Sequence, residues 1–270
     1  MSPKKVTQSK KHSLNARRTR RRTFLVGSVV VVGVLLSVGV FVGLRREEVT
    51  LASVSVSETT YVRGDLIIEI VEESLRGSFA FIVPRANAFF YPHDAIQKEL
   101  QTTFHSIKEV TFKREGLTAL AVSIVERTPE ARWCDDSTPG TRCLFLDETG
   151  FAFALATSSE SMRTYTGGGF AGTLGTTFLP EEYQRLKVFL DDLTTASGRT
   201  ITEVAIDEYG DVFVRFKEGG EVRVTLSSIN TPLLDTIASV FRSRRFSEGD
   251  EFLYADFRFG NKIYVKFVGE

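Results

Sequence analysis

The residues best suited to chemistry in this chain are adjacent charged pairs, and their spacing argues against catalysis. Three such pairs stand out: Glu126–Arg127, Asp135–Asp136 and Asp191–Asp192. Neighbouring side chains on a strand or a helix point in different directions, so adjacent charges are usually solvated or structural. No His, Ser and Asp set follows the apolar N-terminal segment at a spacing that suits nucleophilic catalysis. We therefore predict no catalytic residue and no enzymatic activity.

The two cysteines, Cys134 and Cys143, form a second group with chemical potential. The residues between them include Ser-Thr-Pro-Gly, a sequence typical of turns, which would allow the two thiols to face each other across a loop. Disulfides persist outside the cytoplasm, where the charge pattern described below places this segment. We predict a disulfide, with two free thiols as the alternative. A zinc site is not expected, because two cysteines at this spacing lack a second ligand pair and no histidine complements them.

A glycine-rich stretch, "TYTGGGFAGTLGT" at residues 164–176, is predicted to be a loop. Its three consecutive glycines, Gly167 to Gly169, invite comparison with a phosphate-binding loop. No Lys-Ser or Lys-Thr follows, and no strand-to-helix transition frames the glycines, as that chemistry requires. The sequence thus predicts no cofactor and no small-molecule substrate.

The N-terminal part of the chain predicts a membrane anchor. Residues 1–23 form a basic tail with nine Lys or Arg and no acidic residue, and residues 24–44 carry no charge. A helix over residues 24–44 is long enough to cross a hydrocarbon core of about 30 Å. The positive-inside rule places the tail in the cytoplasm and residues 45–270 outside, as a single-pass type II protein of the plasma (inner) membrane. Because the tail abuts the apolar run, we do not expect it to bind nucleic acid.

An export signal is the alternative for this segment, because "RRTFL" at residues 21–25 is similar to the core of a twin-arginine signal. The apolar run is longer than the roughly 7–15 residues of a typical signal, and no clear cleavage site of small residues follows it. A retained anchor is therefore preferred. The exterior portion then holds 25 basic and 34 acidic residues, a net charge of −9.

The exterior chain is predicted to be α+β, in two parts. Residues 45–132 read as strand, helix, helix, strand, strand, with Leu120, Val122 and Ile124 alternating inward on the last strand. Residues 133–270 read as a β-rich domain: short strands around a turn at 147–150, a helix over 181–198, three strands within 201–226, a helix at 231–246 and a closing hairpin at 252–267. We predict an antiparallel sheet with helices on one face for this second part.

Three motifs connect these elements to a known family. The last strand of the first part ends in "VERTPEARW", which supplies Glu126, Arg127, Pro129, Ala131 and Trp133. An Asp-x-x-Gly turn follows at residues 147–150. The closing segment contains Tyr-x-Asp-x-Arg at residues 254–258.

With the basic tail and the single apolar segment, these motifs resemble the bacterial cell-division family FtsQ, called DivIB in some bacteria. The resemblance extends over nearly the whole chain from Lys4 onward. It implies that residues 45–132 form a POTRA domain, that residues 133–270 form the family's β domain, and that the Glu-Arg-x-Pro motif joins the two. The cysteine pair and the glycine run are not part of the family's pattern.

The resemblance also implies a function. The chain is expected to be a divisome scaffold at the division septum that recruits FtsB-like and FtsL-like partners, or DivIC-like partners, and helps to control septal peptidoglycan synthesis. The partner strand is expected at the final strand region, whose candidate residues are Phe259, Gly260, Lys262, Tyr264, Val265 and Lys266. A terminal strand at a sheet edge suits this role, although its lysines also protect such an edge from aggregation.

The alternative function is a secretion or envelope-assembly component that uses its POTRA domain to bind extended chains. Such a protein would be expected to carry repeated POTRA units or a membrane barrel, and the sequence indicates one unit. A third alternative, an exported enzyme, requires a cleaved N-terminus and a cofactor site.

Overall fold

The computed structural model describes residues 11–80, 83–135, 142–157, 162–247, 250–260 and 262–269. The predicted turn at 137–140, Asp136, Asn261 and the first ten residues of the basic tail lie outside these ranges. The chain divides into two compact units. The first holds the chain up to Ser57 with residues 64–97 and 111–123, and the second holds residues 58–63, 98–110 and the chain from Ile124 onward.

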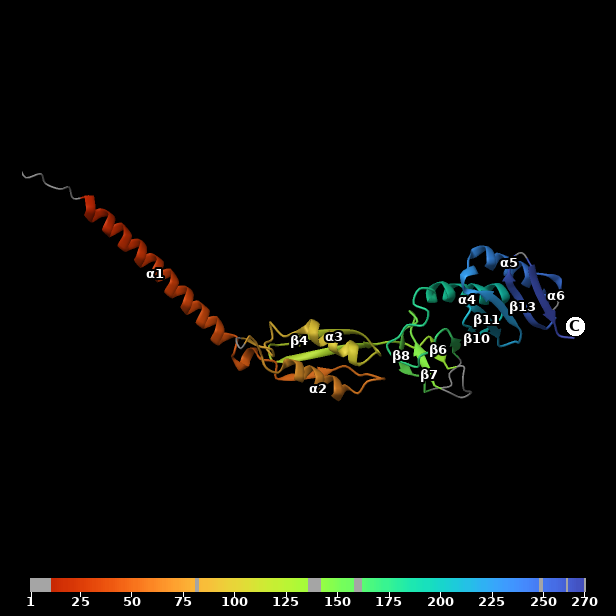
Figure 1. Ribbon diagram of the computed structural model, residues 1–270. Helices are drawn as coiled ribbons and strands as arrows, with labels where there is room; N and C mark the ends of the chain where they lie inside the picture. Colours follow the sequence, from red (N-terminus) through yellow and green to blue (C-terminus); the bar gives the residue numbers. More distant parts are fainter. Residues whose placement is uncertain are drawn as a thin grey trace, which may run out of the picture. The chain divides into compact units, whose positions relative to one another are not determined.

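The first unit begins with a long helix, α1 (Lys11–Gly43; Figure 1). Its stretch from Arg21 to Gly43 is long and apolar enough to cross a membrane, and none of that stretch is buried inside the protein. This agrees with the predicted segment at residues 24–44 to within one residue at its C-terminal end. Helical structure suits this stretch because hydrocarbon offers the backbone no other hydrogen-bond partner.

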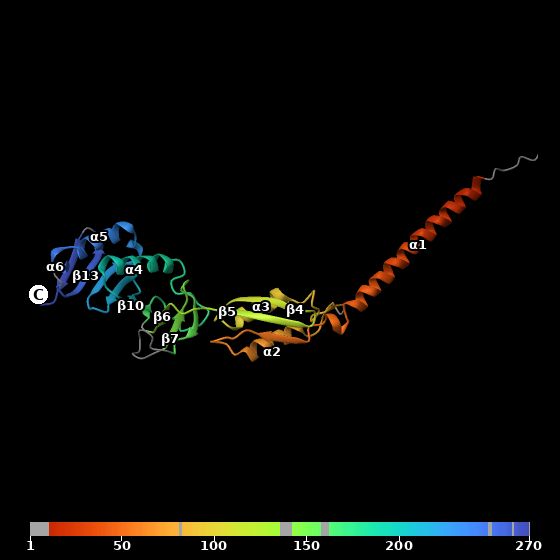
Figure 2. The ribbon, with the colours of Figure 1, turned by 180° about the vertical axis from the view of Figure 1, so that it is seen from behind.

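Residues 45–126 follow the predicted order of strand, helix, helix, strand, strand. A short 3₁₀ turn at Glu47–Val49 precedes it, and a two-strand hairpin is inserted between the two helices. The elements are β1 (Ser53–Val56), α2 (Gly64–Leu75), β2 (Ser78–Phe79), β3 (Val83–Pro84), α3 (His93–Thr103), β4 (Ile107–Glu115) and β5 (Ala119–Glu126). Figure 1 labels α2, α3 and β4, and Figure 2 also labels β5.

Three of these strands form a sheet in the order β1-β5-β4, with β1 parallel to β5, and β2 pairs with β3 in a separate hairpin. Helix α2 packs on β1 and buries Ile67, Val71 and Leu75, which are four residues apart and so share one helix face. On β5, Leu120 and Val122 are buried, as the alternating pattern predicted.

The second unit is built on a nine-stranded sheet in the order β14-β13-β12-β11-β10-β9-β6-β7-β8. Its elements are β6 (Ala131–Cys134), β7 (Cys143–Leu146), β8 (Ala152–Leu155), β9 (Arg163–Gly167), α4 (Tyr183–Ser197), β10 (Ile201–Ile206), β11 (Asp211–Phe216), β12 (Glu221–Thr225), a 3₁₀ turn (Leu226–Ser228), α5 (Thr231–Phe241), α6 (Arg244–Ser247), β13 (Phe252–Phe259) and β14 (Lys262–Phe267). Strand β6 starts before the predicted domain boundary at residue 132.

This sheet is mixed, so the prediction of an antiparallel sheet is wrong. Strand β9 runs parallel to both β6 and β10, and β12 runs parallel to β13. The reason lies in the connections, because α4 separates β9 from β10 and α5 with α6 separates β12 from β13. A strand that returns after a helix commonly lies parallel to the strand before it. The prediction of a loop at residues 164–176 is also wrong at its start, where Arg163–Gly167 forms β9.

The core of the second unit lies between the sheet and its helices. Helix α4 buries Tyr183, Leu186, Phe189, Leu190 and Leu193, and it packs beside α5 (Figure 1). On the central strands, buried Val or Phe alternates with polar residues. On β12, for example, Val222 and Val224 are fully buried, whereas Glu221 and Arg223 are half-buried. One sheet face therefore lies in the core, and the other carries charged side chains.

Candidate functional site

Strand β14 is the first strand in the order of the nine-stranded sheet. It pairs antiparallel with β13, and Val265 lies opposite Ala255. Within the described part of the chain, no further strand pairs with its outer side. Backbone N–H and C=O groups along such an edge can take a strand from another chain.

The side chains of β14 separate into a core-facing and an exposed set. Phe267 is buried and Val265 packs on the core cluster, whereas Lys262, Tyr264 and Lys266 are exposed. Strand alternation places Ile263 on the same side as Val265, but Ile263 lies near the start of β14 and is 38% exposed. The exposed set thus combines an aromatic ring with two cations along one edge strand.

An aromatic and charged cluster continues from β14 onto β13. The rings of Phe259 and Tyr264 meet edge to face, with centroids 5.4 Å apart. Arg258 lies over the Phe259 ring at 5.6 Å and donates hydrogen bonds from Nη1 to Asp211 Oδ2 at 2.5 Å and from Nη2 to Asp256 Oδ2 at 2.6 Å. The spacing of Asp256 and Arg258, two residues apart on a strand, places both on one face. The sequence shows the spacing of Asp256 and Arg258, but it does not predict the ion pair between Arg258 and Asp211.

Asp256 and Arg258 stabilise each other in their ionised forms. Burial alone would raise the pKa of Asp256, but the hydrogen bonds that Arg258 donates from its side chain and backbone outweigh burial and lower the pKa. The hydrogen bond to Asp256 also raises the pKa of Arg258. A fixed ion pair of this kind holds Arg258 in place beside Phe259, and so gives the exposed end of β13 a defined shape.

The predicted joining motif forms a second group, which begins at the end of β5 and continues into β6, and β6 is separated from β14 by five strands in the order of the nine-stranded sheet. Glu126 accepts three backbone hydrogen bonds: from Thr60 N at 2.6 Å to Oε2, and from Tyr61 N at 2.9 Å and Val62 N at 3.2 Å to Oε1. The carboxylate therefore caps a loop that lies more than sixty residues earlier in the chain. This is a structural role, as predicted for a charge at the end of a strand.

Arg127 binds a different segment from its neighbour Glu126. Its Nη1 donates to Asp147 Oδ2 at 2.5 Å, its Nε donates to the His105 carbonyl at 3.1 Å, and its guanidinium lies 4.3 Å from the centre of the Phe151 ring. Asp147 is fully buried and opens the Asp-x-x-Gly turn. The Glu-Arg-x-Pro motif and the Asp-x-x-Gly turn therefore meet in the ion pair between Arg127 and Asp147, which the sequence alone did not predict.

Asp147 is the most deeply buried charge in this contact. Its second oxygen, Oδ1, accepts hydrogen bonds from Thr149 N at 2.8 Å, Thr149 Oγ1 at 2.6 Å and Phe151 N at 3.1 Å. Burial alone would raise the pKa of Asp147, but the hydrogen bonds from Thr149, Arg127 and Phe151 together lower it. The carboxylate is therefore ionised at neutral pH and organises both the turn and Arg127.

The remaining motif residues lie beside Gly167, the first glycine of the run. Pro129 precedes β6, in which Ala131 and Trp133 are buried. Trp133 Nε1 donates to the Gly167 carbonyl at 2.9 Å. Gly167 has φ +71°, and an added Cβ would lie 1.9 Å from the carbonyl oxygen of Ile206. The glycine thus serves close packing at the end of β9, and this accounts for it without a phosphate ligand.

Cys134 and Cys143 are joined by a disulfide. They lie directly opposite each other in the register of β6 and β7. The bond therefore closes the connection between two paired strands, at the place where the turn signal suggested that the thiols face each other.

Replacing both cysteines with serine is expected to lower the free energy of unfolding by roughly 2–3 kcal/mol, because the cross-link limits the unfolded chain over a loop of this length. Denaturant unfolding of the oxidised protein and of the double variant measures the difference. Equal midpoints, with alkylation that shows two reactive thiols in the parent, would contradict this.

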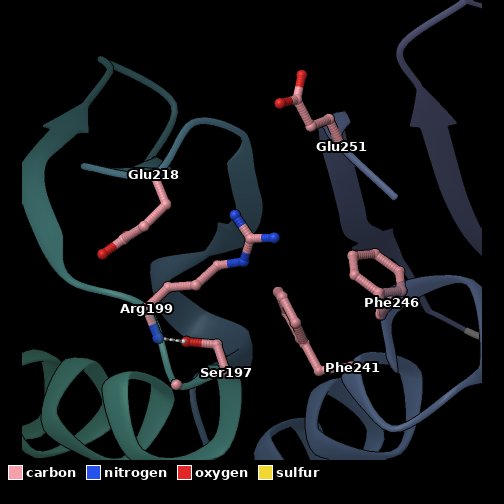
Figure 3. Close-up of a pocket in the computed structure, with 7 residues that line it drawn as sticks. Ser197, Arg199, Glu218, Phe241, Phe246 and Glu251 are labelled. Carbon is pink, nitrogen blue, oxygen red and sulfur yellow. Dashed lines mark hydrogen bonds between the residues drawn. The ribbon is translucent and has the colours of Figure 1, made fainter. Parts of the chain in front are cut away.

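A pocket of about 440 Å³ lies where α4 ends, beside α5 and α6. Figure 3 shows Arg199 pointing into it, with Glu218 and Glu251 at its rim and the rings of Phe241 and Phe246 on one wall. Phe246 also contacts Phe267 of β14 through its ring, with centroids 5.2 Å apart. The sequence did not predict this pocket, because its residues come from α4, α5, α6 and the loops before β10, β12 and β13. Arg199 Nη1 donates to the Gly219 carbonyl at 3.2 Å, and its guanidinium lies 5.0 Å from the centre of the Phe252 ring, so the cation is held among aromatic rings.

Among the described residues, no group of three or more His, Cys, Asp or Glu side chains is arranged to hold a metal ion. No protein-family model matches this chain, and no curated protein is similar enough to it to count as a relative. The functional assignment therefore rests on the motifs and on the geometry of the two groups described above.

Proposed function

We propose that this chain is a membrane-anchored scaffold of the bacterial divisome, similar to FtsQ and DivIB. In this proposal α1 spans the plasma membrane with its N-terminus in the cytoplasm, and the exterior part acts at the division septum without catalysing a reaction. The partners are FtsB-like and FtsL-like proteins, or DivIC-like proteins. Through them, the chain helps to control septal peptidoglycan synthesis.

The observation that carries the proposal is the edge strand β14. Its outer side has no strand partner in the described chain, and exposed Tyr264 lies on it against Phe259. Aromatic and Arg side chains are the commonest anchors at protein interfaces, and Arg258 stands fixed beside the same ring. In this proposal a partner strand extends the sheet at β14, and the residues that follow that strand reach the pocket at Arg199.

The Glu126 and Arg127 contacts suit a protein that must hold its shape while bound. A POTRA domain over residues 45–132 and a β domain over residues 133–270 are part of the proposal. Each of the two adjacent side chains ties the connecting segment to a different part of the chain. These hydrogen bonds define the local structure around Glu126 and Arg127.

A fluorescent protein fused to the N-terminus is expected to concentrate the chain at mid-cell in dividing cells, because a divisome scaffold is recruited to the septum. Fluorescence microscopy of growing bacteria measures the ratio of septal to lateral signal. A matched chain, with residues 24–44 replaced by another single-pass anchor, is expected to retain its partner complex, since β14 and the pocket lie in the exterior part.

A uniform signal around the envelope at all stages of growth would contradict the septal proposal. If such a chain also captured extended, unfolded polypeptides, the alternative function in secretion or envelope assembly would replace it. Co-purification of an FtsB-like or DivIC-like protein with the exterior part separates the two functions directly.

A further inference from the structure

Two consecutive phenylalanines stand out on the surface of the first unit. Phe89 and Phe90 are 55% and 56% exposed, although Phe is normally among the residues most often buried. They lie between the β2–β3 hairpin and α3, in the segment Ala86-Asn87-Ala88-Phe89-Phe90. Adjacent exposed rings of this kind mark a place where another apolar phase or partner covers the protein.

The segment is held rigidly by one buried residue, Asn87. Its Oδ1 accepts a hydrogen bond from Phe89 N at 2.9 Å, and its backbone carbonyl accepts one from Phe90 N at 3.1 Å. The Asn87 side chain is completely buried, as an amide with satisfied hydrogen bonds can be. The two rings are therefore presented by a defined turn rather than by a loose loop.

The same asparagine ties this turn to the end of the apolar helix. Asn87 Nδ2 donates to the carbonyl of Leu44 at 2.9 Å, and Leu44 directly follows the last residue of α1. Two backbone hydrogen bonds reinforce the link, from Ala88 N to Val49 O at 2.9 Å and from Leu51 N to Ala86 O at 2.7 Å. These hydrogen bonds keep Phe89 and Phe90 close to the C-terminal end of α1. If α1 spans a bilayer, the two rings consequently lie near the lipid headgroups at that end.

Arginines lie near this place, and Glu47 and Glu48 follow two of them in the sequence. Arg45 and Arg46 follow Leu44 in the sequence, and the Arg45 guanidinium lies 4.3 Å from the centre of the Phe41 ring. Arg114 donates to the Ala88 carbonyl at 3.1 Å, and its guanidinium lies 5.4 Å from the centre of the Phe89 ring. Arginines whose stems lie along apolar groups can direct their charge to lipid phosphates.

We propose that Phe89 and Phe90 insert into the boundary between headgroups and acyl chains on the outer side of the bilayer that α1 spans. The lipid is the occupant because covalent attachment and the Asn87–Leu44 hydrogen bond keep the rings beside it whenever α1 is inserted. Apolar rings flanked by Arg match an interface of acyl chains and phosphates. The proposal rests on α1 being a membrane span, which belongs to the proposed function.

The test uses the full chain in vesicles of phosphatidylethanolamine and phosphatidylglycerol, with an environment-sensitive fluorophore on the single-substitution variant Phe90→Cys. The two native cysteines do not react, because they are joined to each other. Lipids with a nitroxide near the headgroup are expected to quench this probe several-fold more than a probe on Tyr209→Cys. Tyr209 is the matched control, a surface aromatic residue of the second unit that is 83% exposed.

A third probe, on Val34→Cys in the middle of α1, separates the two possible failures. If Val34→Cys is quenched by lipids with a deep nitroxide but Phe90→Cys and the repeat variant Phe89→Cys behave like Tyr209→Cys, the insertion is wrong and the span stands. If Val34→Cys is also unquenched, the membrane span itself is wrong and the insertion falls with it. Quenching at residues 34, 89 and 90 but not at 209 is the result that we expect.

Discussion

Replacing Tyr264 with Ala is expected to weaken the complex with the strand-donating division partner by roughly 30-fold, which corresponds to about 2 kcal/mol for a central aromatic anchor. Tyr264 is half-exposed on the edge strand and touches Phe259. In a sheet extended by a partner strand, its ring would be covered, so truncation removes apolar burial at the interface. Isothermal titration with the purified exterior part of the partner measures the change.

The matched control for this variant is Tyr209→Ala, which removes a more exposed tyrosine from the β10–β11 turn and is expected to leave the affinity unchanged. Val265→Pro provides an independent check, since proline lacks the backbone donor that a ladder needs. Circular dichroism must show that each variant is folded. A folded Tyr264→Ala and a folded Val265→Pro that both bind like the parent chain would rule out β14 as the site.

Replacing Asp147 with Ala is expected to lower the free energy of unfolding of the second unit by about 3–5 kcal/mol, the usual cost of removing one partner of a buried ion pair. Arg127 would lose its carboxylate, and the backbone N–H groups of Thr149 and Phe151 would lose their acceptor. Fluorescence of Trp133, the only tryptophan and a buried residue of β6, reports this unfolding in urea.

Glu148→Ala is the matched control, because Glu148 is the next residue and its ion pair with Lys108 is exposed on both sides. Exposed pairs contribute about 0–1 kcal/mol, so a small effect is expected.

The stabilisation that Asp147 provides also depends on pH. Its carboxyl has a lowered pKa in the folded protein, so the stabilisation is complete above the unfolded pKa of about 4 and declines as the pH falls below it. Equal losses in the two variants, or no decline in acid, would contradict this account.

Much of the fold was predictable because its signals are local. The apolar run at residues 24–44 and the alternation of Leu120 with Val122 each report on a few neighbouring residues, and both agree with the structure. The helix over residues 181–198 was predicted within two residues of α4 at its start and one at its end. Periodicity of apolar residues is a direct consequence of helix and strand geometry, so a single sequence contains it.

The features that were missed depend on long-range pairing. Strand β9 is five residues long and ends in glycines, so it has the local signature of a loop, and only its neighbours β6 and β10 make it a strand. The contacts of Glu126 with Thr60 and of Arg127 with Asp147 join segments that no periodicity connects. Within the candidate site, the sequence indicated the exposed residues of β14 but not the pocket at Arg199, which is assembled from separate elements.

The place of β9 also sets how the sheet can assemble. Strands β6, β7 and β8 pair as antiparallel neighbours, and so do β10, β11 and β12, through short connections such as the one from Ile206 to Val212. Strand β9 alone joins these two groups, and it pairs Ala131 with Arg163 and Thr164 with Glu203, residues more than thirty positions apart. Loop closure of that length loses chain entropy before any contact compensates it. The entropic cost of joining these two hairpin groups is thus concentrated at β9, and the parallel pairing of β12 with β13 adds a second closure of similar length.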